Sequence, residues 1–394
     1  MKDNSAKLLG LEEVIVKNVY EDEKACHIEL ELPRRPHPCP CCKAMTSKIH
    51  DYRMQRIKDL PNHAKVTYLH LRKRRYVCPQ CNKRFYEDNS FLPRYYRVTR
   101  RMVAGILDRF RATVPASDIA KQNNISVSTA LRYFGLVDYG RKPLPRVLSI
   151  DEFKGNAGGE KFQTILADAE KHRIQDILPS RKSAELVRYF LQYSREERME
   201  VQYVVMDMSS LFRNVAETCF PKATIVADRY HVVRQAIWAM ENVRKRVQKE
   251  LSPEWRKYFK RSRCLLDKNP DKLTEDEHDR LRVILGISSD LEYAYHLKND
   301  FQSLIKSPNS DTGRARLADW VYLAERAGLP EFKACTRAVH NWSDAILASF
   351  DCAYSNGFTE GCNNKTKVLK RVCFGVRNFR RFRNRILHCA ALAQ

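Results

Sequence analysis

Two cysteine pairs constrain the front of this chain more than any other sequence feature. Cys39 and Cys42 close one Cys-x-x-Cys turn, and Cys78 and Cys81 close a second. Each turn directs two thiolates at one point, so the two turns together supply the four soft ligands of a tetrahedral zinc ion. Residues 43–77 can span the gap if they form a hairpin. The sequence therefore predicts a zinc ribbon whose ion is structural, because no ligand position is left for water.

The sequence leaves alternatives open for the ligands of the metal. Cys41 lies inside the first turn, and His37 or His50 could substitute for one of the thiolates. The competing interpretation is a redox pair or a set of free thiols, but the proline in each turn and the surrounding basic residues favour zinc. Eight further cysteines are interpreted as packing residues: Cys26, Cys219, Cys264, Cys335, Cys352, Cys362, Cys373 and Cys389.

The charge of the chain is unevenly distributed. The 394 residues carry a formal net charge of +24, and residues 34–101 hold 18 Lys and Arg against four acids. Residues 365–385 hold nine basic residues and no acid. Such an excess predicts a polyanionic partner, first of all nucleic acid, with a merely basic housekeeping protein as the alternative. Because no apolar run reaches 18 residues and the N-terminus lacks a signal-like apolar core, a cytoplasmic, nucleoid-associated protein is expected.

Residues 117–134 have the spacing of a helix-turn-helix. Ile119 and Ala120 fall on the first helix, and residues 123–124 form the turn. Ser126 is expected to cap the second helix, while Ile125 and Val127 pack inward. The second helix then exposes three side chains to base edges or phosphates, namely Ser128, Thr129 and Arg132. Any two amphipathic helices joined by asparagines can imitate this pattern.

The sequence around this motif predicts strands on both sides. Alternation of apolar residues from Cys26 to Leu32 is typical of a half-buried strand, and residues 66–72 repeat the pattern before Cys78. After a linker at residues 140–145, strands are predicted at 147–150, 162–166, 174–178, 201–206 and 223–227, with helices at 184–193 and 209–219. Three strands, then helix, strand, helix, strand is the order of an RNase H-like fold. Residues 229–350 read as helical, with four packing anchors expected in Trp238, Trp255, Trp320 and Trp342.

Acidic residues end two of these strands. Asp151 follows the apolar run Leu-Ser-Ile, and Asp207 follows Val-Val-Met. A carboxylate at the end of a buried strand must be solvated, paired or bound to metal, and two on neighbouring strands can hold a divalent ion between them. Glu360, just before a basic helix, can complete a two-metal site for phosphoryl transfer. Taken singly, each acid can also be a turn or capping residue, or a helix N-terminal acid.

In this order, the motifs resemble bacterial insertion-sequence transposases of the DDE class, in the branch called the ISL-three family. The resemblance rests on the zinc ribbon, the helix-turn-helix, Ile-Asp151-Glu, Met-Asp207-Met, Ala-Asp228-Arg-Tyr-His231-Val and Ser355-Asn-Gly-Phe-Thr-Glu360-Gly-Cys-Asn-Asn-Lys. It spans the chain from Cys39 to about Leu387. The knuckle would more often close as Cys-Gly, where this chain has Cys42.

The resemblance implies roles for the acids. Asp151 and Asp207 would be the first two catalytic acids and Glu360 the third, together holding Mg²⁺ or Mn²⁺. Asp228 competes with Asp207 as the second acid, and His231 would act close to the active site. Glu152 and Asp168 are lesser candidates.

The expected fold is multidomain α+β. We expect a β-rich zinc-ribbon DNA-binding domain over residues 1–98 and a helix-turn-helix domain over 99–140. An RNase H-like α/β catalytic core would occupy 146–232 and 351–394, interrupted by an all-α insertion over 233–350, and its last part would end in a single basic helix.

The function that the resemblance implies is DNA transposition. The protein would bind terminal inverted repeats, cleave the 3′ ends and transfer them to target DNA, working as a homodimer or higher assembly on double-stranded DNA. Phosphate contacts are expected from Lys365, Lys367, Lys370, Arg371, Arg377, Arg380 and Arg381. The alternatives are a catalytically silent DNA-binding regulator derived from a transposase and an RNase H-like nuclease without strand transfer.

Overall fold

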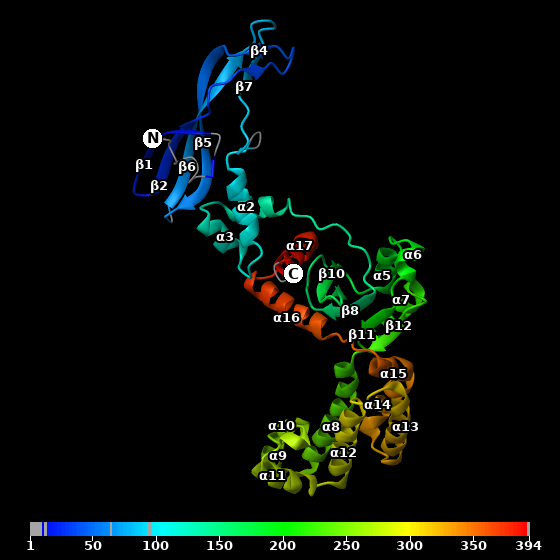
Figure 1. Ribbon diagram of the computed structural model, residues 1–394. Coiled ribbons are helices and arrows are strands. Elements are labelled where there is room, and N and C mark those ends of the chain that lie inside the picture. The colour runs from blue at the N-terminus through cyan, green and yellow to red at the C-terminus, as the bar shows by residue number, and fades with distance from the viewer. Residues whose placement is uncertain (1–9, 12–13, 64, 93–95, 392–394) are drawn as a thin grey trace. The chain divides into compact units, whose positions relative to one another are not determined.

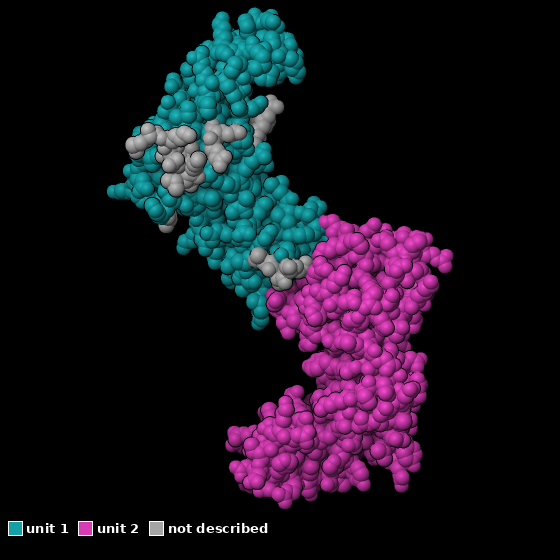
Figure 2. All heavy atoms as spheres, in the orientation of Figure 1, with its two compact units in different colours: residues 1–139, 368–376, 380–394 teal, residues 140–367, 377–379 magenta. Residues whose placement is uncertain are grey.

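The computed structural model describes residues 10–11, 14–63, 65–92 and 96–391 (Figure 1). The chain forms two compact units, drawn in teal and magenta in Figure 2. The first unit contains residues 1–139, 368–376 and 380–394, and the second contains residues 140–367 and 377–379.

A five-stranded sheet dominates the first unit. Its strands follow the order β1-β2-β6-β5, with β7 paired to β6. The alternation predicted from Cys26 onward is confirmed, because Cys26, Ile28 and Leu30 are buried and pack with Ile57 and Leu69. The strands are β1 (Ile15–Glu21), β2 (Ala25–Glu31), β5 (Ile49–Asn62), β6 (Lys65–Val77) and β7 (Arg84–Tyr86).

A long hairpin separates the two cysteine pairs, as the zinc-ribbon interpretation requires. Its arms are β5 and β6, paired antiparallel over most of their length. A second, short antiparallel pair, β3 (His37–Pro38) and β4 (Met45–Thr46), brackets the first cysteine turn.

Three helices follow the sheet: α2 (Arg100–Arg109), α3 (Ala116–Gln122) and α4 (Val127–Phe134). The predicted cap is confirmed, because the Ser126 hydroxyl accepts a hydrogen bond from the Thr129 amide at 3.2 Å. Asn124 turns the chain with φ of 52°. The prediction that Val127 packs inward is wrong: the residue is 42% exposed, because Ala130, Tyr133 and Phe134 form the buried side of α4. Thr129, expected to be exposed, is half-buried.

The closing segment forms two helices, so the prediction of a single basic closing helix is wrong. Gly375, with φ of 86°, lies in the break between α16 (Gly357–Val372) and α17 (Phe379–Ala390). In α17, Phe382 is buried and the Arg385 guanidinium donates hydrogen bonds to the carbonyls of Ala112 and Val114. Most of α17 therefore belongs to the first compact unit rather than to the α/β unit.

A mixed five-stranded sheet forms the base of the second unit, with order β10-β9-β8-β11-β12. Strands occur at all five predicted positions. β8 runs antiparallel to β9 and parallel to β11, which is parallel to β12. The strands are β8 (Val147–Phe153), β9 (Gln163–Asp168), β10 (Arg173–Leu178), β11 (Tyr203–Met206) and β12 (Thr224–Ala227). The helices between them are α5 (Ser183–Phe190), α6 (Arg195–Met199) and α7 (Ser210–Cys219).

Both faces of this sheet are covered. On one face, Leu148 and Met206 belong to a cluster that includes Phe190 of α5 and Phe212 of α7. On the other face, Val147, Val205 and Val226 pack with residues that precede α16, including Cys352 and the partly buried Tyr354. The strands are therefore fixed from both sides, and the residues at their ends occupy defined positions.

A helical block leads from β12 to α16 and shares its hydrophobic cluster with the sheet. Trp320 and Trp342 are buried as predicted, but the prediction that Trp238 and Trp255 are packing anchors is wrong, because they are 48% and 45% exposed. The elements are α8 (Arg229–Glu250), α9 (Pro253–Lys260), α10 (Arg263–Asp267), η1 (Pro270–Lys272), α11 (Glu275–Leu285), α12 (Ser289–Leu304), α13 (Ser310–Arg326), η2 (Pro330–Phe332), α14 (Lys333–Asn341) and α15 (Ser343–Asp351).

Candidate active site and zinc cluster

The four predicted cysteines converge in the first unit. The Sγ atoms of Cys39, Cys42, Cys78 and Cys81 all lie within 4.8 Å of one another. Two of the S–S distances are 3.5 Å (Cys39 to Cys81) and 3.4 Å (Cys42 to Cys78). Tetrahedral zinc with bonds of about 2.3 Å separates its sulfur ligands by roughly 3.8 Å, so the cluster has the size and chemistry of a zinc site.

The two turns have the same backbone geometry. The Lys43 amide donates to the Cys39 carbonyl at 3.0 Å, and the Asn82 amide donates to the Cys78 carbonyl at 2.9 Å. Lys43 and Asn82 both have positive φ, 64° and 55°. This repeated turn directs each pair of thiols toward the other pair.

The open question about the ligands is answered by position. Cys41 is exposed and outside the cluster. His37 packs against the Tyr76 ring with centroids 4.8 Å apart, and His50 lies 3.2 Å from the Asp51 carboxylate. The four cysteines are therefore the group of candidate zinc ligands that the described residues of the first unit bring together.

In the second unit, the sheet brings the first two predicted acids side by side. β8 and β11 are parallel, with Ile150 in register with Met206. Asp151 is the next residue of β8, which continues to Phe153, and Asp207 directly follows the end of β11. Both are half-buried. Because the two strands are parallel neighbours, the two carboxylates lie near each other, and the charge of Asp207 acts on Asp151.

The electrostatics of this edge disfavour ionised acids in the absence of a cation. Burial, together with the negative charge of Asp207, raises the pKa of Asp151 to about 6. Burial also raises the pKa of Asp207, with the charges of Glu152 and Asp228 acting in the same direction. Acids held in this way gain most from a bound cation, which supplies the missing compensation.

Helix α16 is attached to the centre of the sheet by buried polar groups. The Ser149 hydroxyl of β8 donates to Asn356 Oδ1 at 2.6 Å and lies 2.5 Å from the Thr359 hydroxyl. All three residues are buried. These bonds fix the start of α16, and with it Glu360, beside the strand that carries Asp151.

One turn later, Asn363 contacts the first acid directly. Its Nδ2 donates to Asp151 Oδ2 at 2.7 Å and to the Glu152 carbonyl at 3.4 Å. Glu360 precedes Asn363 by three residues, so the two side chains share a face of α16, and Glu360 is exposed. The sequence interpretation missed Asn363, although its i+3 spacing from Glu360 was a usable signal.

Asp228 and His231 stand at the start of α8, next to the acids. Asp228 is buried, accepts a hydrogen bond from the Asn356 amide at 3.2 Å, and lies 4.0 Å from His231 Nε2. The lesser candidates are engaged elsewhere. Glu152 accepts from Arg181, and Asp168 accepts backbone amides in the turn after β9.

The oxygen atoms at this edge suit a hard divalent cation. Asp207 Oδ1 and Asn363 Oδ1 are buried and receive no hydrogen bond from the described residues. Carboxylate and amide oxygens are the ligands that Mg²⁺ prefers. The acids nevertheless form an open set. Within the described part of the chain, the four cysteines are the one group that brings three or more metal-ligating atoms within 4.8 Å of one another.

The predicted DNA-binding residues are divided between elements. Ser128, Thr129 and Arg132 lie on α4. Lys365, Lys367 and Arg371 are exposed on α16, and Lys370 is half-buried there. Arg377 is exposed before α17, Arg380 forms an ion pair with Asp138 at 3.3 Å, and Arg381 is half-buried.

Two family models match this chain. A transposase model, DDE_Tnp_ISL3, covers residues 148–386, more than half of the chain and all of the acids described above. The chain belongs to the ISL3 family of transposases. A second model, the zinc finger of the IS204/IS1001/IS1096/IS1165 transposases, covers residues 35–81 and thus the four cysteines. The protein is therefore a DDE-family enzyme of an insertion sequence, and a transposase binds DNA.

Curated relatives agree with this assignment. The transposase for insertion sequence element IS1001 of Bordetella parapertussis is 25% identical over 359 residues, covering 86% of this chain and 85% of that protein. The transposase for insertion sequence element IS1557 of Mycobacterium tuberculosis is 26% identical over 256 residues, which cover 59% of this chain and 57% of that protein. Among the described helices of this transposase, none is long and apolar enough to span a membrane.

Proposed function

We propose that this transposase cleaves the ends of its element and joins them to target DNA at a site built from Asp151, Asp207 and Glu360. The observation that carries the proposal is the attachment of α16 to β8. Ser149 and Asn363 together hold that helix against the strand of Asp151. In this arrangement Glu360 would lie on the same side as Asp151 of β8 and Asp207, which directly follows β11. In this proposal, the sheet order is that of an RNase H-like core and α8–α15 form its helical insertion.

Asp207, rather than Asp228, is proposed as the second acid. Asp228 already accepts the Asn356 amide and is buried, so it serves to fix the chain that leads into α16. Asp207 has an oxygen atom without a partner among the described residues, and it directly follows Met206, which is in register with Ile150, the residue before Asp151. Its neighbours therefore leave it available to a metal.

Mg²⁺ or Mn²⁺ held by these oxygens would activate the attacking oxygen and stabilise the leaving one. Asp151, Asp207 and Glu360 would hold the metal ions as ionised carboxylates, and Asn363 would keep the Asp151 carboxylate oriented. His231, close to Asp228, is the proposed site for a proton during the reaction. In the first step water attacks phosphorus, and the P–O3′ bond breaks to leave a 3′ hydroxyl. In the second step that hydroxyl attacks the phosphorus of a target phosphodiester and forms a new P–O bond. The target's own P–O3′ bond breaks and releases a 3′ hydroxyl, without a covalent protein intermediate.

The first unit is proposed to hold the terminal inverted repeats. The zinc ribbon and α2–α4 supply the positive surface, and the basic residues of α16 contact phosphates near the acids. Because two ends must be joined to one target, the active form is proposed to be a dimer or a higher assembly.

The proposal is tested with a duplex that carries the element's own terminal repeat, incubated with Mg²⁺. Asp151→Ala, Asp207→Ala and Glu360→Ala should each abolish cleavage while leaving end binding intact. Full activity of Asp207→Ala together with loss in Asp228→Ala would reverse the choice of second acid. Wild type that binds but never cuts would indicate a silent regulator. Cutting without joining of a pre-cut 3′ end would indicate a nuclease.

A further inference from the structure

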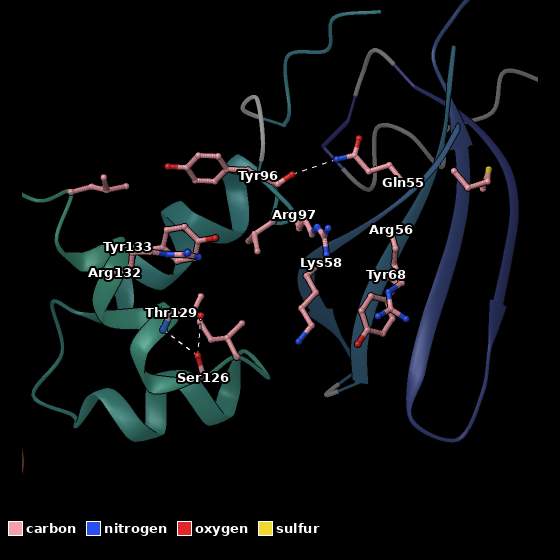
Figure 3. A pocket seen from close by; sticks show the side chains of 14 residues that line it. Gln55, Arg56, Lys58, Tyr68, Tyr96, Arg97, Ser126, Thr129, Arg132 and Tyr133 are labelled. Atoms are coloured by element: carbon pink, nitrogen blue, oxygen red, sulfur yellow. Dashed lines mark hydrogen bonds between the residues drawn. The ribbon is translucent and has the colours of Figure 1, made fainter. Parts of the chain in front are cut away.

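A cleft of about 810 Å³ opens within the first unit, between the β5–β6 hairpin and helix α4 (Figure 3). One wall is the outer face of the hairpin, with Arg56 and Lys58 on β5 and Tyr68 on β6. The other wall is α4 with the turn before it, including Ser126, Thr129 and Arg132. Helix α4 thus faces a second basic surface across an open space.

The lining is positively charged. Four of the described residues that line the cleft are cationic, namely Arg56, Lys58, Arg97 and Arg132. Among all the described residues of the lining, none is acidic. Two arginines outside the cleft are compensated by buried acids, because Arg74 pairs with Glu87 and Arg101 pairs with Asp59. The four cleft cations form no ion pair with a carboxylate of the described residues. Burial and the neighbouring Arg56 charge lower the pKa of Lys58, as expected where positive charges crowd.

Two of the guanidinium groups are oriented by aromatic rings. The Arg56 guanidinium carbon lies 4.7 Å from the centroid of the Tyr68 ring, and that of Arg132 lies 5.3 Å from the centroid of the Tyr133 ring. Cation–π contact fixes the plane of a guanidinium group while its N–H edges stay available. Tyr96 adds a third tyrosine to the lining. Arginine and tyrosine donors of this kind are typical phosphate ligands.

The two walls are joined, so the cleft is formed before any ligand binds. Lys58 Nζ donates to the Asn124 carbonyl in the turn of the helical motif. The Lys58 amide donates to the Arg97 carbonyl at 2.8 Å, and Thr99 and Arg101 both donate to the buried Asp59 carboxylate. Gly105 of α2 leaves room for the hairpin, because a Cβ there would lie 3.0 Å from a Leu60 methyl group. A preformed site avoids the cost of ordering its side chains on binding.

We propose that this cleft holds the sugar–phosphate backbone of one strand of the element-end duplex, so that the β5–β6 hairpin acts as a second DNA-binding element opposite α4. Its charge and its donors match a phosphodiester chain, and its open shape admits a continuous strand. The proposal rests on the proposed function and adds Arg56 and Arg97 as phosphate ligands that position the end on α4.

The test measures binding of a fluorescent terminal-repeat duplex by anisotropy at several KCl concentrations, with the full-length, zinc-loaded protein. Each lost phosphate contact should reduce the slope of log K against log[salt] by about 0.9. Arg56→Gln and Arg97→Gln should each reduce the salt slope by this amount. Each should also weaken binding roughly fivefold at 0.15 M salt, because one phosphate contact strengthens binding by about that factor at 0.15 M salt compared with 1 M salt. The double variant should lose roughly thirtyfold.

The matched control is Arg53→Gln, an exposed arginine on the same strand that does not line the cleft. It removes the same charge and should leave the salt slope unchanged. Equal thermal midpoints and zinc contents show that all variants are folded.

Two results would overturn the inference: slopes unaltered by Arg56→Gln and Arg97→Gln, or an equal change in Arg53→Gln. If wild type cuts its ends in either case, the proposed function stands without the cleft. If wild type neither prefers nor cuts its ends, the proposed function fails. The slopes then measured on a random-sequence duplex still decide whether the cleft holds phosphates.

Discussion

The zinc cluster and the carboxylate site differ in how completely the polypeptide builds them. The four thiols already lie within 4.8 Å of one another, held by two identical turns that flank a rigid hairpin. The acids come from two adjacent strands and one attached helix, yet Glu360 is exposed and the set does not close. The four thiols form a complete ligand cluster within the fold, whereas the acids lie near one another without forming a closed cluster.

This difference follows from the chemistry that each site serves. A structural zinc ion whose four ligand positions are occupied by thiolates contributes to folding. The polypeptide can therefore fix the geometry of such a site through its turns. A catalytic site must admit DNA between the ligands, and closely packed bare carboxylates would repel one another. Burial raises the pKa of Asp151 to about 6, and the neighbouring charge of Asp207 adds to this shift. We therefore infer that the acids close around metal and substrate together.

The largest expected effect is the loss of zinc. Cys78→Ser removes one ligand from a site whose binding free energy, roughly 10–16 kcal/mol for structural zinc, is coupled to folding. The ribbon should unfold, the zinc content should fall to near zero, and end binding should weaken by at least a hundredfold. Cys41→Ser, next to a ligand but outside the cluster, should change neither zinc content nor binding. Full zinc content in Cys78→Ser would show that the cluster is not the metal site.

The second effect concerns pH and tests the openness of the carboxylate site. The folded-state pKa of Asp151 lies above its unfolded value, so the metal-free protein should be most stable where the acid is protonated and should lose stability as pH rises through about 6. The loss amounts to about 3 kcal/mol between pH 4 and 8. Asp151→Asn should lack this component of the pH dependence. At pH 8, added Mg²⁺ should raise the stability of the wild-type protein but not that of Asp151→Asn. Urea unfolding followed by circular dichroism measures both. Parallel pH profiles for the two proteins would contradict the prediction.

Asn363 links the helix of Glu360 to Asp151, and its removal should loosen that link without removing an acid. Asn363→Ala should reduce cleavage by roughly 10–100-fold and raise the Mg²⁺ concentration needed for half-maximal rate, as expected for a group that orients a metal ligand. The neighbouring Asn364 is exposed, and Asn364→Ala is the matched control with near wild-type metal dependence. A rate lowered at every Mg²⁺ concentration by the same factor would argue against a role in orienting Asp151.

Some residues of the two sites could be predicted from the sequence, and others could not. The zinc ligands and the acids of β8 and β11 follow local rules, namely short spacing within a turn and apolar runs that end in a carboxylate. Asn363 was missed despite its i+3 spacing from Glu360, because an asparagine within a helix usually faces solvent. The cleft was equally hidden, since Arg56 and Arg132 are 76 positions apart in the chain. The break at Gly375 was missed because the basic residues on both sides suggested one continuous helix.

The smallest effect examines the anchor of α16 itself. Ser149→Ala leaves Asn356 Oδ1 and the Thr359 hydroxyl without their buried partner, at a cost of about 1–3 kcal/mol. Because the second compact unit has a large shared hydrophobic cluster, the loss should appear as local opening of the first turns of α16 rather than as global unfolding. Hydrogen exchange of residues 357–363 should accelerate, whereas Ser183→Ala, at an exposed position on α5, should leave it unchanged. Since Glu360 lies in this segment and the zinc cluster does not, exchange in the ribbon should stay at the wild-type rate. Unchanged exchange in α16 would mean that Asn363 and apolar packing suffice to hold Glu360 beside the strand acids.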